Sequence, residues 1–191
     1  MAVDVSVPYF SQRDNGFNPS GACNVSSVAM CLYHFGIRGD GSHEQLEDQM
    51  YERCLEKGWS RHSPEGLKSL IESYPGCKDD LTMTGSLADI QEALDEGKVC
   101  IVHGYFTGFG HILVVRGYDP VNFLVNDPYG EWSPWSYNKA VSGEKLRYSR
   151  RGLAACCDSF SQGEAIDRYA RMSDKDIGKA HSIWLHRVYR A

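Results

Sequence analysis

The spacing of the apolar residues changes once along the chain, near residue 98, and this change restricts the fold more than any other feature. Before it, as between 24 and 35, apolar residues recur every three or four positions, which predicts helices. After it, short apolar runs at 99–102, 112–115 and 123–125 are bounded by Gly, Asp and Pro, which is typical of buried strands. We therefore expect an α+β domain in which an N-terminal helical half packs on a C-terminal antiparallel sheet.

Helix starts and strand ends can be placed more closely in several segments. Three further helices are predicted from capping pairs, and these pairs are Ser42 with Gln45, Ser63 with Pro64, and Ser86 with Asp89. Residues 118–122 predict the turn of a hairpin, while 3–9 and 182–189 have the pattern of a first and a last strand. The stretch 132–172 gives no clear pattern beyond some helical character.

Composition excludes several classes of protein. The 191 residues are expected to form one domain over 1–191. A net charge of −5 argues against a nucleic-acid partner. Because no apolar run reaches the length of a membrane helix, we expect no membrane partner. The chain has no phosphate-binding loop and no dinucleotide fingerprint, so no cofactor is predicted.

The start of the chain and its cysteines bear on the cellular compartment. The first residues lack the basic start and apolar run of a signal peptide, which favours a cytoplasmic protein. The seven cysteines include no Cys-x-x-Cys pair. Most are expected to be reduced and buried, and a metal site built from cysteines and histidines is a weaker alternative.

Cys23 differs from the other cysteines because it stands where a polar loop enters the first helix. A helix N-terminus and a nearby imidazolium lower the pKa of a thiol, and the thiolate is the nucleophilic form. His111 opens an apolar strand behind Gly110 and could act as the base. Asp127, or its neighbour Asn126, ends the next strand and could orient that ring, with Asp127 preferred.

Acyl transfer to a cysteine also requires donors for the oxyanion. The side-chain amide of Gln12 and the backbone N–H of Cys23 are candidates. His103, beside Gly104, is the competing base. The remaining histidines, His186 among them, are expected at the surface or in packing. The aromatic residues Trp132, Trp135 and Tyr137 are expected either at the rim of a substrate site or in packing.

Four segments carry a resemblance to a known family. They are Val7-Pro8-Tyr9-Phe10-Ser11-Gln12, Gly21-Ala22-Cys23-Asn24-Val25-Ser26-Ser27, Gly110-His111 through Gly117-Tyr118-Asp119, and Asn126-Asp127-Pro128. Over 5–132 the chain resembles the papain-like cysteine peptidases of the double-glycine (bacteriocin) leader peptidase type, and more closely their stand-alone bacterial and phage relatives. The resemblance implies a papain-like fold with Gln12 in the oxyanion hole, Cys23 as nucleophile, His111 as base and Asp127 as orienting acid.

The chain departs from that family directly after the cysteine. The relatives usually continue with Gly-Pro-Thr or Gly-Pro-Ala, whereas this chain has Asn24-Val25-Ser26. The resemblance implies a thiol hydrolase that cleaves peptide bonds, and a phage-type lysin that cuts peptidoglycan peptide cross-links after lysis is the leading hypothesis. Alternatives are a cytosolic peptide-processing protease or transpeptidase, and a catalytically idle module that binds a peptide.

Overall fold

The computed structural model describes residues 2–191, and Met1 lies outside the described part. Its helices are η1 (Gln12–Asp14), α1 (Cys23–His34), α2 (Leu46–Lys57), α3 (Pro64–Glu72), α4 (Leu87–Asp95), α5 (Arg150–Cys157), α6 (Gln162–Arg171) and α7 (Asp174–Ile177). Its strands are β1 (Val3–Asp4), β2 (Cys77–Asp79), β3 (Thr82–Gly85), β4 (Val99–Gly104), β5 (His111–Tyr118), β6 (Asn122–Asn126), β7 (Glu131–Ser133), β8 (Ser136–Asn138), β9 (Leu146–Ser149) and β10 (Ile183–Arg190). The expectation of a single domain over 1–191 stays a prediction.

Two of the three predicted helix caps are confirmed. The Ser63 side chain accepts a hydrogen bond from the Gly66 backbone at the start of α3. Ser86 and Asp89 form the reciprocal capping box at the start of α4. Each such cap supplies partners for backbone N–H groups that a helix start leaves unpaired.

The third predicted cap, Ser42 with Gln45, is wrong. The helix α2 begins at Leu46, so Gln45 itself is the cap residue, and its side chain makes no capping hydrogen bond. Ser42 instead hydrogen-bonds locally, since its backbone N–H donates to Asp40. Short polar side chains compete with helix starts by making such local turns, which explains the error.

The large sheet is antiparallel, with strand order β2-β10-β4-β5-β6-β9. In addition, β1 pairs with β5, and β3 pairs with β10. The predicted hairpin connects β5 and β6. The last strand, predicted at 182–189, is found at Ile183–Arg190, inside the sheet between β2 and β4. The predicted first strand is shorter than expected, because only Val3–Asp4 joins the ladder before the chain turns away.

Helices cover both faces of this sheet. The helices α1 and α3 contact one face, with α2 packed on them, as predicted for the N-terminal half, while α4 and α5 contact the other face. The residues of β5 alternate between two apolar clusters, with Ile112 in the cluster under α1 and Leu113 in the cluster on the opposite side. A strand that buries both faces reads as a continuous apolar run, as 112–115 does.

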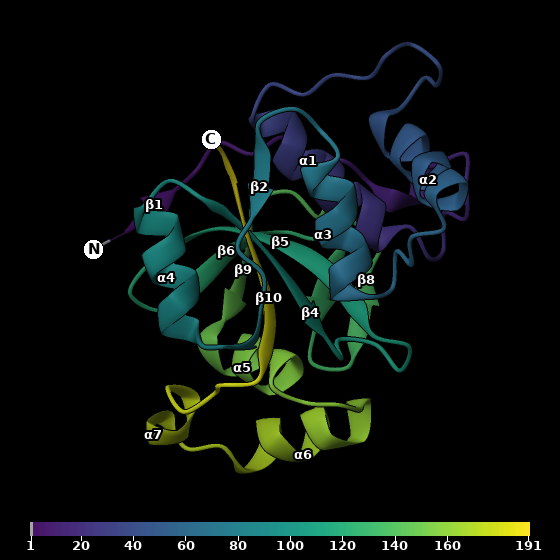
Figure 1. Cartoon of the computed structure of the whole chain (residues 1–191). Helices are drawn as coiled ribbons and strands as arrows, with labels where there is room; N and C mark the ends of the chain where they lie inside the picture. The colour runs from purple at the N-terminus through teal and green to yellow at the C-terminus, as the bar shows by residue number, and fades with distance from the viewer. Residues whose placement is uncertain (1) are drawn as a thin grey trace.

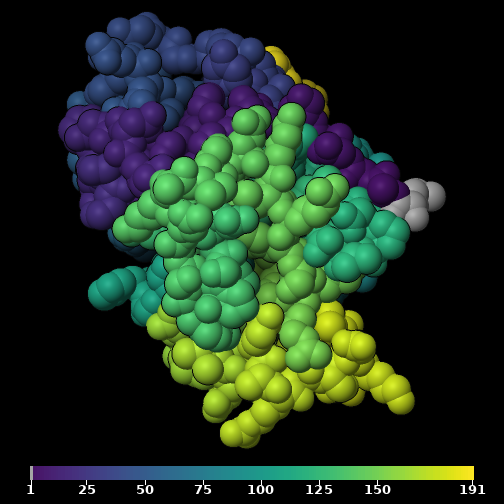
Figure 2. Space-filling view, turned by 180° about the vertical axis from the view of Figure 1, so that it is seen from behind, coloured from purple at the N-terminus to yellow at the C-terminus, as the bar shows by residue number. Residues whose placement is uncertain are grey.

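The stretch 132–172 holds nearly all of β7 and the whole of β8, β9, α5 and α6. In Figure 1, α6 and α7 lie at one end of the molecule, away from α2. From behind, the green segments around 125–150 cover much of the visible face, between the purple N-terminal part and the yellow C-terminal part (Figure 2). No helix within residues 2–191 is long and apolar enough to cross a membrane.

Candidate active site

Cys23 is the first residue of α1 and is half-buried, whereas the other six cysteines are fully buried. The loop before it is braced by Arg61, whose guanidinium donates to the Gly21 carbonyl at 2.6 Å. Asn24 accepts from the Val25 backbone N–H at 2.9 Å, so its side chain satisfies one first-turn donor. The helix entry is therefore formed without the glycine and proline that the related peptidases carry there.

His111 is the first residue of β5, and the loop before it is held rigidly. The Thr107 hydroxyl donates to the Gly110 carbonyl at 2.8 Å, and Gly110 has a φ of +80°, which favours glycine. The His111 ring is buried, and its Nε2 donates to Asp127 Oδ1 at 2.7 Å. Nδ1 is thus the ring nitrogen that remains for Cys23.

Asp127 is fully buried and accepts four hydrogen bonds. Besides the His111 ring, its donors are the Tyr129 backbone N–H at 3.0 Å and the hydroxyls of Tyr137 at 2.9 Å and Tyr148 at 2.8 Å. Burial, followed by the Asp127 charge, raises the pKa of both tyrosines, so they remain neutral donors. A carboxylate with this many donors is held in one orientation.

Asn126, the alternative to Asp127, points elsewhere. Its amide donates to the carbonyls of Val7 and Pro8, each at 3.1 Å, and its oxygen accepts from the Lys145 backbone at 3.0 Å. Asn126 therefore ties the N-terminal segment to the sheet. Of the two neighbours, Asp127 is the one that contacts the His111 ring.

The charge state of His111 follows from three opposing effects. Burial is the largest and lowers its pKa, but the Asp127 carboxylate and the neighbouring Cys23 sulfur together raise that pKa to about 10. The ring is therefore an imidazolium at neutral pH. An imidazolium beside a cysteine at a helix N-terminus is the electrostatic setting that favours a thiolate.

Gln12 lies in the short helix η1 and is almost fully buried. Its backbone N–H donates to the Pro128 carbonyl at 2.9 Å, directly after Asp127, and its side-chain nitrogen donates to the Pro19 carbonyl at 3.1 Å. Its side-chain oxygen is buried without a partner among residues 2–191. Gln12, Cys23 and His111 line one cleft, so the structure brings the predicted residues together.

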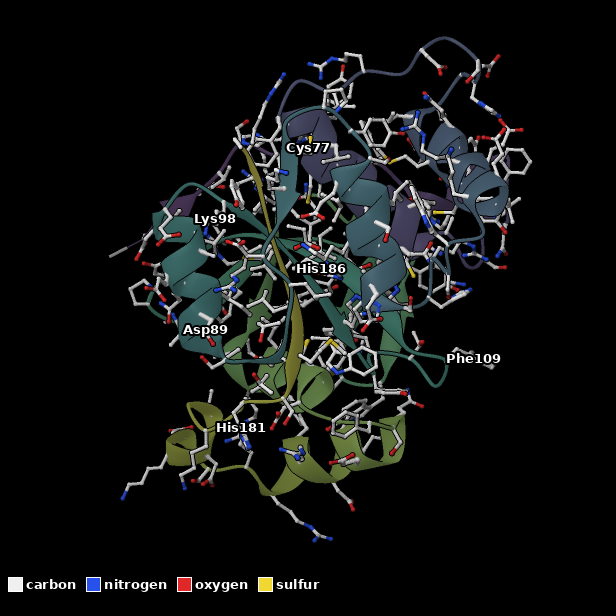
Figure 3. All side chains as sticks on the ribbon, viewed as in Figure 1. Cys77, Asp89, Lys98, Phe109, His181 and His186 are labelled. Carbon is white, nitrogen blue, oxygen red and sulfur yellow. The ribbon has the colours of Figure 1, made fainter. Side chains whose placement is uncertain are left out.

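This cleft has a volume of about 380 Å³ and a composition that bears on its chemistry. Its lining includes three histidines, His62, His103 and His111, but no Asp, Glu, Lys or Arg. At its edge Phe109 is fully exposed, and Figure 3 shows it projecting from the loop between β4 and β5. Within residues 2–191, no group of three or more potential metal ligands is placed to hold an ion.

Several other predicted or overlooked residues can now be placed. Trp132 is buried against Phe106, and the Tyr137 hydroxyl donates to Asp127, so neither lines the cleft. Tyr148 and Arg61 were not singled out from the sequence, because nothing in the local pattern marks them. His103, the competing base, makes its hydrogen bond to the His186 ring rather than to Asp127.

The mixed helix and antiparallel-sheet architecture is that of the papain-like C39 peptidases. A solved structure from Bacillus anthracis, described as a C39-like peptidase, shares this fold with a TM-score of 0.55 and 16% identity, covering 100% of this chain and 99% of that one. The Peptidase_C39 like family matches residues 5–156, and the chain belongs to this family. At the level of class, this membership supports a cysteine peptidase that hydrolyses peptide bonds.

A double-glycine motif protease from an AMS/PCAT transporter, solved in complex with the leader peptide, has a TM-score of 0.49 and 15% identity, covering 97% of this chain and 94% of that one. No curated protein matches the chain at a significant level.

Proposed function

We propose that this protein is a cysteine peptidase in which Cys23 is the nucleophile, His111 the general base and acid, and Asp127 the residue that orients the ring. The observation that carries the proposal is the continuous line from the buried Asp127 through His111 to the half-buried Cys23 at the cleft. Gln12 and the backbone N–H of Cys23 supply the oxyanion hole. As the first helical residue, Cys23 has a backbone N–H that the helix leaves unpaired.

The proposed reaction uses one proton held by His111. The Cys23 thiolate attacks the scissile carbonyl carbon, and the oxyanion forms against Gln12 and the backbone N–H. The imidazolium then gives its Nδ1 proton to the leaving amine as the C–N bond breaks, which leaves a thioester. Neutral His111 next removes a proton from water, the hydroxide attacks the thioester, and the acid product leaves as the thiolate re-forms.

Asp127 has a defined part in this scheme. The charged His111 ring must keep Nδ1 toward Cys23 through both half-reactions, and the 2.7 Å bond at Nε2 fixes that orientation. Because two tyrosine hydroxyls and a backbone N–H also bind the carboxylate, it does not have to rotate or take up the proton.

For the substrate we propose a peptide, and among peptides the cross-links of peptidoglycan, cut by a lysin-type enzyme made in the cytoplasm and acting after lysis. The alternative within the same chemistry is the processing of a cytosolic peptide. Purified peptidoglycan sacculi and a library of quenched linear peptides distinguish the two. Release of new amino groups from sacculi supports the lysin hypothesis, whereas cleavage confined to the linear peptides rejects it.

The thiolate–imidazolium pair is tested by iodoacetamide alkylation of each cysteine across pH, mapped by peptide, in the wild-type protein and in His111→Ala. We expect fast alkylation of Cys23 at pH 6 in the wild type only. The buried cysteines are internal controls, because burial raises the pKa of Cys54 to about 11 and of Cys100 to about 12. Equal alkylation of Cys23 in both proteins would contradict the proposal and favour an idle peptide-binding module.

A further inference from the structure

Three side chains behind the cleft form a hydrogen-bonded chain, here called the relay, which the proposed reaction does not use. Nε2 of His103 on β4 lies 3.0 Å from Nε2 of His186 on β10. Nδ1 of His186 lies 2.6 Å from Oδ2 of Asp79 on β2, and both of these side chains are fully buried. Figure 3 shows His186 in the interior, in the middle of the sheet.

The relay ends at the cleft. His103 lines the cleft together with Cys23 and His111. It pairs across the sheet with Ile112, and Ile112 lines the same cleft. The second ring nitrogen of His103, Nδ1, has no hydrogen-bond partner among the described residues. This nitrogen is therefore available to a molecule in the cleft.

The charge of Asp79 requires a compensating proton on the relay. Two charged side chains contact the Asp79 backbone, since Lys68 donates to its carbonyl and Glu72 accepts from its N–H. These two also pair with each other at 2.7 Å and so offset one another. A buried carboxylate without a counter-charge is costly, so we infer that one compensating proton is held in the 2.6 Å contact between Asp79 and His186.

The position of that proton decides what His103 offers to the cleft. Burial, and then the charge on His186, lower the pKa of His103 to about 3, so His103 is the neutral ring. With that proton in the Asp79–His186 contact, Nε2 of His186 carries a hydrogen and donates it, so Nε2 of His103 must accept. Because a neutral imidazole carries one N–H, the hydrogen of His103 is on Nδ1. The relay thus presents a fixed N–H donor to the cleft.

Stability alone does not account for this arrangement. A buried ion pair is often no more stabilising than apolar side chains of the same size. Asp79 Oδ1 is in addition buried without a partner within the part of the chain that the structure describes. The cleft lining contains no Asp, Glu, Lys or Arg, so no carboxylate, ammonium or guanidinium there competes with an N–H donor for a substrate oxygen.

We propose that His103 binds the substrate through its Nδ1–H, which donates to an oxygen of the peptide, either a main-chain carbonyl or a carboxylate. His186 and Asp79 are positioning residues that fix the tautomer of His103. The proposal deepens the peptidase function and rests on it for the nature of the ligand. It does not rest on Cys23 chemistry, so it can be tested in a protein without the nucleophile.

The first test is NMR of the full-length Cys23→Ala protein labelled with ¹⁵N in its histidines. Long-range ¹H–¹⁵N spectra report which nitrogen of each ring carries hydrogen. We expect Nδ1 of His103 to be protonated, and its signal to shift when N-acetyl-dialanine, as free acid or as amide, is added. Equal binding of both probes identifies a carbonyl, and tighter binding of the acid identifies a carboxylate. A hydrogen on Nε2 instead, or no shift with either probe, overturns the proposal.

The second test compares the dissociation constant of the better probe among variants made in the same background. His103→Phe keeps a ring but removes the donor, and we expect about a tenfold weaker binding, the value of one ordinary hydrogen bond. His103→Gln restores an N–H and should recover part of the loss. His181→Phe is the matched control on the surface, where Figure 3 labels the ring. Unchanged binding in His103→Phe overturns the proposal even if the wild-type protein cleaves peptides.

Discussion

Two buried histidine–aspartate pairs lie in this molecule, and they are satisfied in different ways. In the first pair His111 meets Asp127 at 2.7 Å, and Asp127 has three further donors. In the second pair His186 meets Asp79 at 2.6 Å, and the other carboxylate oxygen of Asp79 has no partner among residues 2–191. The same two residue types therefore give one carboxylate that is held from four sides and one that depends on a single ring.

The comparison indicates what each pair can do. An aspartate with four donors tolerates changes in the charge of its histidine, as a ring that gains and loses a proton during turnover requires. An aspartate with one donor depends on that donor keeping its hydrogen, which suits a ring that holds a tautomer and does not exchange protons with substrate. We therefore assign turnover to the first pair and positioning to the second.

The largest contrast is expected in activity. His111→Ala should lower kcat/KM by about 10⁶-fold, the loss known for removing the base of a nucleophile–histidine–acid set. His186→Gln, which keeps a polar side chain in the second pair, should change kcat by less than about tenfold, the effect of one hydrogen bond. Steady-state kinetics on the best peptide of the library measures both. Similar losses of kcat in the two variants would contradict the assignment of turnover to the first pair and positioning to the second.

The order reverses for stability. His186→Ala leaves Asp79 without any side-chain donor, and breaking a buried ion pair in this way costs about 3–5 kcal/mol. His111→Ala leaves Asp127 with three donors, so its loss in the free energy of unfolding should be smaller. Urea unfolding of both variants tests this order. A His111→Ala protein that is the less stable of the two would contradict the account of Asp127.

A third contrast concerns pH. Asp127→Asn removes the charge that raises the pKa of His111 to about 10, so the imidazolium should be lost at a lower pH. A histidine whose folded pKa lies above its unfolded value stabilises the fold fully below pH 6.5, and this contribution is lost as pH rises toward 10. The alkylation rate of Cys23 and the free energy of unfolding are both followed from pH 6 to 10. In Asp127→Asn, the pH at which each of them falls should be lower than in the wild type. Asp79→Asn is the control, and an equal change of these pH values in that variant would refute the assignment.

The two pairs also differ in how far the sequence alone predicts them. Cys23, His111 and Asp127 each stand at or directly after the end of a helix or strand, with Gly or Pro within two positions, so a local pattern marks them. The partners of the second pair are 107 positions apart and meet only because β10 is inserted between β2 and β4. Nothing in a short window shows where a last strand enters a sheet. His186 was accordingly expected to do no more than lie at the surface or pack.

The same limit applies to the wider shell of the first pair. The Tyr148 hydroxyl reaches Asp127 from 21 positions away, out of a stretch whose pattern predicted little. The smallest predicted effect tests this residue. Tyr148→Phe removes one donor from a buried carboxylate and the acceptor of the Trp132 backbone N–H, and we expect a loss of about 1–3 kcal/mol in the free energy of unfolding.

Tyr137→Phe provides the matched comparison, because both hydroxyls donate to the same oxygen, Asp127 Oδ2. If the two tyrosines share the load, each single variant should lose less than half of what the double variant loses, since the remaining hydroxyl still satisfies that oxygen. Strict additivity in urea unfolding would instead show that the two hydroxyls contribute independently, and the absence of any loss would show that they contribute nothing. The four-sided hold on Asp127, which distinguishes it from Asp79, would then have to rest on the Tyr129 backbone and the His111 ring.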